Sequence, residues 1–245
     1  MEAQGAGTER GGFSLHGLTL PLGPNDVSPV IWQALQAGKY EAKEARHVAA
    51  LLRAGDRVLE LGTGIGVITC LMAQVEGVKI WSFDANPHTV ALAERVARAN
   101  GVIGTAGGDG VTFGHRLMMV GAAKSYPFYL RRDFWMSSMI EAQGPYEEVI
   151  EVGSEDIDAF IAAQDINVLV MDIEGAERSL LAEADLSRID RVFLELHDHL
   201  YGLQGLREIF AAMAEKGFGY DPRNSSGPCV QFSRDHGEAR SYCES

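Results

Sequence analysis

Through the middle of the chain, short apolar runs alternate with longer segments in which apolar residues recur every three or four positions. The runs predict buried β-strands at residues 57–61, 78–83, 116–120, 167–171 and 191–196, with 102–103 as an alternative for the third strand. The longer segments predict helices at residues 66–75, 87–100, 154–163 (with Ser154 as its N-cap), 176–184 and 203–216. Strands that alternate with helices are typical of a parallel sheet covered by helices.

Flanking segments extend this core at both ends. Apolar and polar positions alternate over residues 13–22, which predicts a short strand or hairpin outside the main sheet, and helices are expected at 27–37 and 40–53. Further short strands are expected at 126–130 and 148–152, and a terminal hairpin pairs 219–220 with 230–232. The expected fold is α/β: a mostly parallel seven-stranded sheet with helices on both faces and a C-terminal antiparallel hairpin.

This pattern also suggests a division of the chain. We expect a disordered lead (residues 1–11), a strand and helical cap (12–55), a ligand-binding core (56–233) and a polar tail (234–245).

A glycine turn follows the first core strand, in the sequence Val58-Leu59-Glu60-Leu61-Gly62-Thr63-Gly64-Ile65-Gly66. A turn without side chains lets a ligand lie against the backbone. Dinucleotide enzymes favour G-x-G-x-x-G, whereas here the third glycine comes one position early. Glu60 suits a cationic ligand with an ammonium and a sulfonium, and Asp84 ends the next strand, where a carboxylate accepts ribose hydroxyls. The turn therefore favours S-adenosylmethionine, and a turn that binds no ligand is the alternative.

Polar or small residues follow every core strand. Because ligands of open α/β sheets bind beyond the carboxyl ends of the strands, these residues are the candidates for a site. They are Glu60 at the end of the first strand, Asp84 and Asn86 after the second, Gly121 to Ala123 after the third, Asp172, Glu174 and Glu177 after the fourth, and Glu195 and His197 at the end of the fifth. The small residues around Ala122 would let an adenine ring approach.

Several of these segments resemble the FkbM family of S-adenosylmethionine-dependent methyltransferases. They are Met171-Asp172-Ile173-Glu174-Gly175-Ala176-Glu177, Phe193-Leu194-Glu195-Leu196-His197, Phe134-Trp135-Met136-Ser137-Ser138-Met139 and Gly38-Lys39-Tyr40-Glu41. The chain departs from the family where the first strand ends in Glu-Leu-Gly-Thr-Gly instead of the commoner Asp-x-Gly-Ala-Asn/Gly. The resemblance implies a Rossmann-like class I methyltransferase fold and, most often, O-methylation of a small-molecule hydroxyl.

The resemblance and the strand-end residues together give a set of residues expected to contact the methyl donor, S-adenosylmethionine. They are Tyr40, Glu41, Glu60, Gly62, Thr63, Gly64, Asp84, Asn86, Ala122, Ser138 and Asp172.

Methyl transfer to a hydroxyl needs aligned reactants and a proton acceptor. We expect His197 to be that base and Asp172 to lie near the acceptor, since the unperturbed pKa of histidine lies close to neutral pH. A histidine hydrogen-bonded only for structure is an equal alternative. Asp172, Glu174 and Glu195 form an oxygen-rich set that could hold Mg²⁺, and Ser137, Ser138 and the aromatic residues of 126–135 could contact donor or acceptor.

Composition argues against some classes of binding partner. The net charge of −13 opposes binding to a nucleic-acid backbone, and the apolar content of 46% is ordinary for a globular protein. The cysteines, Cys70, Cys229 and Cys243, have no metal-site or disulfide spacing. No signal peptide or long apolar run is visible, so we expect a cytoplasmic protein that meets neither nucleic acid nor membrane. The sequence leaves open whether the protein forms a homodimer.

Other functions compete with O-methylation of a small molecule. N-methylation of a small amine needs the same donor site. A nicotinamide-dependent oxidoreductase is disfavoured by the glycine spacing and the terminal hairpin. A non-catalytic partner protein that only binds the cofactor is the third alternative.

Overall fold

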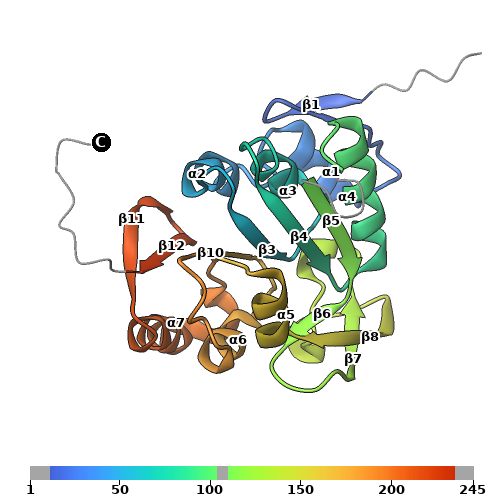
Figure 1. Cartoon of the computed structure of the whole chain (residues 1–245). Helices are drawn as coiled ribbons and strands as arrows, with labels where there is room; N and C mark the ends of the chain where they lie inside the picture. The colour runs from blue at the N-terminus through green and yellow to red at the C-terminus, as the bar shows by residue number, and fades with distance from the viewer. Residues whose placement is uncertain (1–11, 104–109, 235–245) are drawn as a thin grey trace, which may run out of the picture.

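A seven-stranded sheet forms the centre of the protein, in a computed structural model that describes residues 12–103 and 110–234 (Figure 1). Its strand order is β11-β12-β10-β9-β3-β4-β5. The strands are β3 (Arg57–Leu61), β4 (Lys79–Asp84), β5 (Gly110–His115), β9 (Val168–Met171), β10 (Arg191–Glu195), β11 (Phe218–Ser226) and β12 (Cys229–Arg234). β12 runs antiparallel to both of its neighbours, and the other paired strands are parallel. The predicted α/β fold, with its parallel sheet and terminal hairpin, is confirmed.

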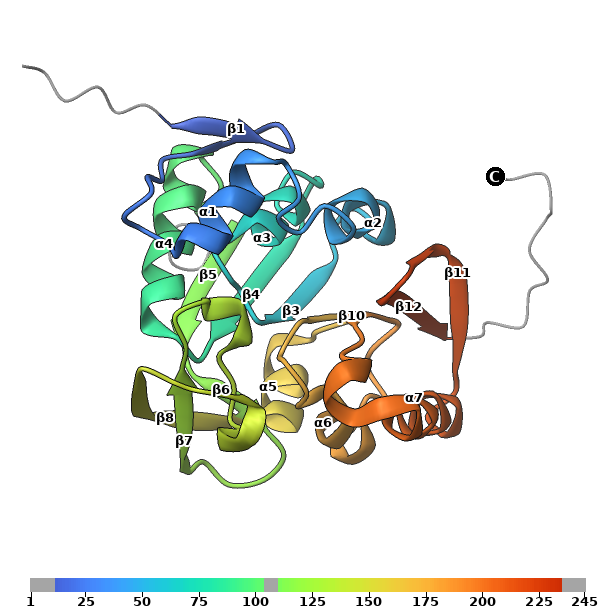
Figure 2. The same ribbon diagram turned by 180° about the vertical axis from the view of Figure 1, so that it is seen from behind.

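Alternate residues of the central strands enter two separate cores, because successive side chains of a strand point to opposite faces. Val58 packs in the core under α1 (Pro29–Gln36), α2 (Glu44–Leu51), α3 (Val67–Met72) and α4 (Pro87–Ala99). Leu59 packs in the core under α5 (Ile157–Gln164), α6 (Glu177–Glu183) and α7 (Asp198–Glu215). The two groups of helices cover opposite faces of the sheet (Figures 1 and 2).

Two small sheets flank the central one. β1 (Phe13–Leu15) and β2 (Leu18–Leu20) form the expected hairpin outside it. Between β5 and α5, the chain forms a three-stranded sheet of β6 (Leu117–Met119), β8 (Glu148–Asp156) and β7 (Ser125–Leu130), with 3-10 turns at Phe134–Met136 and Glu141–Gln143. This insertion begins where β5 ends, so it lies beside the carboxyl ends of the central strands (Figure 2).

The third core strand is not the one predicted. Residues 110–115 form β5 beside β4, whereas 117–119 form β6 of the small sheet. Glycines at the ends of β5 lower its apparent strand propensity. Gly114 is needed there, because a Cβ on it would lie 2.6 Å from a ring carbon of Phe83, its register partner on β4.

Several helix boundaries also differ from the prediction. α2 begins at Glu44 and not at residue 40, because Glu41 has a left-handed backbone (φ 48°) that a helix cannot contain. α5 begins after Asp156, whose carboxylate caps the helix, while the predicted cap Ser154 lies within β8. The predicted lead at 1–11 and residues 235–245 of the predicted tail lie outside the described residues. Among the described helices, not one combines the length and apolar character that crossing a bilayer requires.

Candidate functional site

A cavity of about 420 Å³ lies at the carboxyl ends of β3, β4 and β9. Its floor includes Gly62 and Gly64 of the glycine turn, Asp84 at the end of β4, and Asp172 after β9. The insertion and the segment before α2 supply the opposite walls. The cavity therefore lies where the sequence places a ligand, beyond the ends of parallel strands.

Each glycine of the turn is needed because a different neighbour leaves no room for a side chain. Gly62 (φ 90°) passes so close to β9 that a Cβ on it would lie 1.8 Å from the carbonyl oxygen of Asp172. Gly64 (φ 53°) lies under the N-terminal segment, because a Cβ there would be 2.9 Å from Tyr40 Oη and 3.1 Å from Glu41 Oε1. Gly66 (φ 81°) lets α3 approach Ala93 of α4. Only Gly62 and Gly64 line the cavity.

Asp84 holds the turn from the neighbouring strand. Its Oδ2 accepts a hydrogen bond from the amide of Gly64 (3.0 Å), and its Oδ1 accepts one from the amide of Asn86 (2.8 Å). Burial raises the pKa of Asp84 to about 6, although these hydrogen bonds oppose the shift. The carboxylate faces the cavity and keeps free lone pairs for the hydroxyls of a ligand.

Glu60 does not face the cavity, contrary to the expectation of a contact with a cationic ligand. Its side chain turns toward the α3 face, where Oε2 accepts hydrogen bonds from Thr69 (2.5 Å) and Ser82 (2.5 Å). Burial raises the pKa of Glu60 to about 7. Thr63 is also buried, with its hydroxyl 2.6 Å from that of Ser82. Both residues support the turn from beneath. The sequence carried a signal for this, since Glu60 lies two residues from Val58 along β3 and so points to the same face, into the core under α3.

Tyr40 and Glu41 cover the turn from the other side. Burial, followed by the carboxylates of Glu44 and Asp172, raises the pKa of Glu41 well above its usual range. Burial, followed by the charge of Glu41, likewise raises the pKa of Tyr40. The Oε2 atom of Glu41 is buried and has no hydrogen-bond partner among the described residues. A buried carboxylate oxygen without a donor on the cavity wall is a suitable place for a cationic group.

The loop after β9 is held by one buried carboxylate. Glu177, which has no exposed surface, accepts hydrogen bonds from the amides of Ile173 (3.2 Å) and Gly175 (2.9 Å). Its Oε1 also lies 2.9 Å from Nδ1 of His197. These contacts fix Asp172 and Glu174 on the cavity wall.

His197 lies behind this wall, enclosed by carboxylates. Its Nε2 is 3.3 Å from Asp172 Oδ1 and 3.7 Å from Glu174 Oε1. Burial opposes the charged imidazole, but the contacts with Asp172 and Glu177 outweigh it and raise the pKa of His197 to about 11. The ring is therefore an imidazolium at neutral pH and has no lone pair to accept a proton. The geometry does not support His197 as the base, and it makes this residue the positive partner of Asp172.

Glu174 has the properties that the sequence assigned to His197. Its carboxylate lines the cavity, and burial raises its pKa to about 7, an effect that the charge of His197 partly offsets. Its backbone is left-handed (φ 48°), an uncommon and costly conformation for a residue other than glycine. A carboxyl group that titrates near neutral pH inside a cavity can exchange a proton with a ligand.

Three further expected contacts do not line the cavity. Asn86 caps α4 by accepting a hydrogen bond from the amide of His88 (2.9 Å). Ser138 is buried beneath the insertion, where its hydroxyl accepts from Arg131 Nη1 (3.3 Å) and donates to Gln143. Ala122 lies in an exposed loop after β6, because the strand expected to end before it belongs to the small sheet. Ser137, the neighbour of Ser138, does line the cavity.

The insertion gives the cavity an apolar wall that the sequence indicated only in part. Phe128, Phe134 and Trp135 belong to the aromatic segment singled out in the sequence, and all three line the cavity. Trp135 stacks on Tyr40 with ring centroids 6.2 Å apart, so the insertion and the N-terminal segment meet over the cavity. Met118 and Met139 were missed, because Met118 was assigned to a strand of the central sheet and Met139 ended a segment noted only for its family resemblance.

The predicted Mg²⁺ set of Asp172, Glu174 and Glu195 receives no support. Among the described residues, these three side chains do not converge as a ligand set. Asp172 groups instead with Glu177 and His197, whose ring already contacts both carboxylates.

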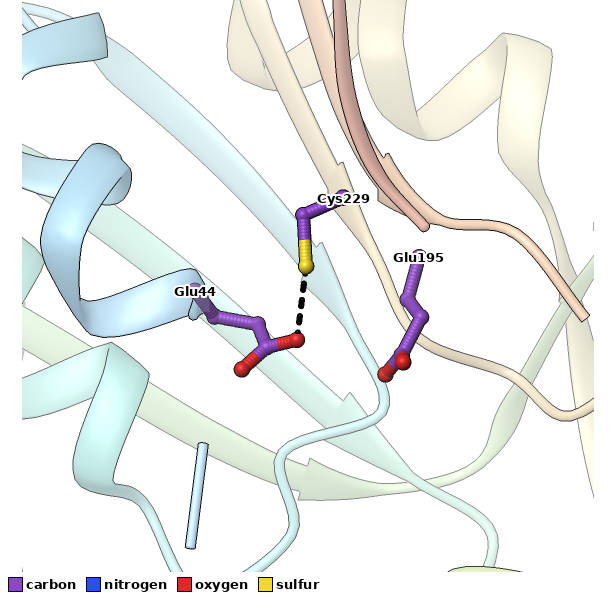
Figure 3. Close-up of side chains that lie close together, drawn as sticks. All are labelled: Glu44, Glu195 and Cys229. Carbon is purple, nitrogen blue, oxygen red and sulfur yellow. Dashed lines mark hydrogen bonds between the residues drawn. The ribbon is translucent and has the colours of Figure 1, made fainter. Parts of the chain in front are cut away.

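Glu195 lies in a separate group with Glu44 and Cys229 (Figure 3). There the Cys229 thiol donates a hydrogen bond to Glu44 Oε1 (2.8 Å). Burial and this carboxylate raise the pKa of Cys229, so the thiol stays protonated.

Comparison with known proteins gives one family match. The family model described as the methyltransferase FkbM domain matches residues 69–220. No curated protein matches the chain significantly.

Three of the solved structures that resemble this chain have low identity to it. The ribosomal protein L11 methylase from Lactobacillus delbrueckii subsp. bulgaricus is 15% identical over 81% of this chain and 80% of its own, with a TM-score of 0.46. Trm5b from Pyrococcus abyssi is 13% identical over 93% of this chain and 56% of its own (TM-score 0.46). Magnesium protoporphyrin IX methyltransferase from Synechocystis PCC 6803, solved with bound SAM, is 15% identical over 84% and 85% (TM-score 0.46).

Proposed function

The chain belongs to the FkbM methyltransferase family and is an S-adenosylmethionine-dependent methyltransferase, and we propose that it methylates a hydroxyl of a small-molecule acceptor. The observation that carries the proposal is the cavity at the carboxyl ends of β3, β4 and β9. It combines a carboxylate that titrates near pH 7 with an apolar wall.

The residues of the cavity fit the methyl donor. Asp84 would accept the ribose hydroxyls, and the backbone of Gly62 and Gly64 leaves room for the donor against the turn. Glu41, with its unpartnered buried oxygen, and Asp172 would face the ammonium group. When bound, the donor supplies a methyl group activated by its sulfonium, so the protein has to align the acceptor and remove one proton.

We assign the removal of this proton to Glu174. An acceptor hydroxyl beside its carboxylate would donate a hydrogen bond to it and lose its proton as the oxygen attacks the methyl group. The imidazolium of His197 would keep Asp172 ionised and oriented, which makes His197 a positioning residue. This assignment replaces the expectation that His197 is the base.

An apolar or aromatic small molecule fits the acceptor side. Phe128, Met118 and Met139 give that side an apolar lining. The net charge of −13 opposes a nucleic-acid acceptor.

Donor binding is tested by isothermal titration with S-adenosylhomocysteine. We expect the wild type to bind it and Asp84→Asn to bind at least about tenfold more weakly, because a charged hydrogen-bond acceptor is lost. Glu215→Gln, which removes an exposed carboxylate at the end of α7, is the matched control and should leave the affinity unchanged. Equal affinity of wild type and Asp84→Asn would contradict the donor site.

The acceptor is tested by turnover on a panel of small phenols, sugars and primary amines. We expect methylation of hydroxyls. Methylation of amines alone would favour N-methyl transfer, and donor binding with no turnover on any member would favour a non-catalytic partner protein.

A further inference from the structure

A second cavity, of about 330 Å³, lies at the amino ends of the parallel strands, on the opposite side of the sheet from the cavity proposed to bind the methyl donor (the donor cavity). Arg191, the first residue of β10, and Ser233 and Arg234, the last residues of β12, lie on one side of it. Arg53, just beyond α2, and Arg223 and Asn224 of β11 also line it, and Asp190 and Gln231 complete the polar lining. We call this cavity the arginine pocket, since four guanidinium groups line it.

Arg191 is fixed in place but keeps one unused donor. The side chain is 6% exposed, with Nη2 2.7 Å from Asp56 Oδ1 and Nη1 donating to the carbonyl of Leu51 (2.7 Å). Its Nε is buried and has no hydrogen-bond partner among the described residues. A buried guanidinium nitrogen without an acceptor is costly, and an oxygen acceptor in the pocket would remove that cost.

The other arginines add positive charge that carboxylates only partly balance. Arg223 pairs with Asp221 (2.8 Å), and Arg234 donates to the carbonyls of Ile189 (2.7 Å) and Lys216 (2.8 Å), which are neutral. Arg53 is exposed, and its side chain has no partner among the described residues. Against the charges of Arg53 and Arg234, the pocket offers the carboxylate of Asp190. The balance favours an anion.

We propose that the arginine pocket binds phosphate, either as the free ion or as the phosphate group of a small molecule. Guanidinium groups bind phosphate oxygens through paired charge-assisted hydrogen bonds. Asn224 and Ser233 also line the pocket, where they donate hydrogen bonds to Gln231 Oε1 (2.8 Å) and Asp221 Oδ2 (3.3 Å). The ligand is small, because the pocket is confined and because the charge of −13 repels a polyanion at long range. This site is separate from the donor cavity and does not depend on the proposed acceptor.

The test is isothermal titration of the full chain with inorganic phosphate and with pyrophosphate in a phosphate-free buffer of constant ionic strength. We expect both probes to bind, pyrophosphate more tightly. Arg53→Gln should weaken pyrophosphate binding about tenfold, since one charged donor is lost. Arg53 is exposed, so its substitution leaves the core intact. Arg46→Gln removes an exposed arginine from α2, outside the pocket, and should change the affinity by no more than about twofold.

Each result decides the proposal. A selective loss in Arg53→Gln, with Arg223→Gln showing the same direction, supports it. Three results would overturn it: no binding of either probe by the wild type, an equal loss in Arg46→Gln, or displacement of pyrophosphate by S-adenosylhomocysteine, which would place the probe in the donor cavity. Tighter binding of a short RNA than of pyrophosphate would also overturn it, because the ligand would then be a nucleic-acid backbone.

Discussion

The amino ends and the carboxyl ends of the central parallel strands, called here the amino edge and the carboxyl edge, differ in how their charged side chains are paired. At the amino ends of the strands, Asp56 is buried with its charge fully met: Oδ1 accepts from Arg191 (2.7 Å) and Asn167 (2.9 Å), and Oδ2 accepts from the amide of Arg53 (2.6 Å). At the carboxyl ends, His197 contacts Asp172, Glu174 and Glu177, and these three belong to a larger set of carboxylates that gather around the cavity. They are Glu41, Glu44, Asp84, Asp172, Glu174, Glu177 and Glu195.

This difference separates charges that stabilise the fold from charges that serve a ligand. A buried pair with its hydrogen bonds satisfied resists unfolding when it is intact, and breaking it leaves an isolated charge. Like charges held together raise one another's pKa and destabilise the protein until a proton or a cation arrives. The carboxyl edge is therefore suited to a cationic donor and to proton transfer.

The largest effect is expected for the proposed base. Glu174→Gln should lower kcat by about 10² to 10⁴-fold, because the group that accepts the proton is lost. In the wild type, kcat should rise with pH through about 7, where Glu174 ionises, and this inflection should vanish in the variant. The measurement is the pH profile of kcat with the best acceptor of the panel, and S-adenosylhomocysteine affinity serves as the control. If His197→Gln removed the inflection while Glu174→Gln retained it, the assignment of the base would be wrong.

At the amino edge, the expected effect is on stability. Asp56→Ala should lower the free energy of unfolding by about 3–5 kcal/mol, since Arg191 is then buried without its partner. Urea denaturation measures this. The control is Arg188→Ala, whose side chain is 56% exposed and pairs with Asp165 at 3.4 Å, and it should cost less than about 1 kcal/mol. Equal losses in the two variants would mean that burial does not distinguish these ion pairs.

The smallest effect concerns Glu195 and the pH dependence of stability. Burial, followed by the charges of Asp172 and Glu44, raises its pKa from 4.5 to about 8 in the folded protein. The unfolded chain releases this proton at lower pH, so the contribution of the protonated group is fully present below about pH 4.5 and is lost as the pH rises to about 8.

Glu195→Gln should therefore make stability fall less between pH 5 and pH 8, by on the order of 1 kcal/mol after allowance for its partial exposure. Urea denaturation at the two pH values checks this, with Glu215→Gln as the control. A fall as steep as that of the wild type would show that repulsion at the carboxyl edge does not limit stability.

Sequence patterns predicted the central strands well because each side of β3 and β9 is buried, which produces continuous apolar runs. β3 was predicted with the bounds that it has, and β9 to within one residue. The insertion was predicted less well. Its strands are mostly exposed or half exposed, and β6 pairs with β8, which begins about thirty residues later. Pairing over that separation leaves no periodic signal in either segment.

Among the expected donor contacts, Tyr40, Glu41, Gly62, Gly64, Asp84 and Asp172 line the cavity, whereas Glu60, Thr63, Asn86, Ala122 and Ser138 do not. The residues that line it are on the turn, just after a strand, or in the loop that covers the turn. Glu60 differs because it is within β3, where the pleat directs its side chain into the α3 face.

The sequence by itself determined the α/β order, the glycine turn and the end of the strands at which the cavity lies, because these depend on local periodicity and on the direction of parallel strands. Only the tertiary structure decided which carboxyl groups have a raised pKa, which of them face the cavity, and that His197 carries a positive charge. The reason is physical: a pKa depends on burial and on neighbouring charges. Around His197, those neighbours come from a loop about twenty residues away in the chain.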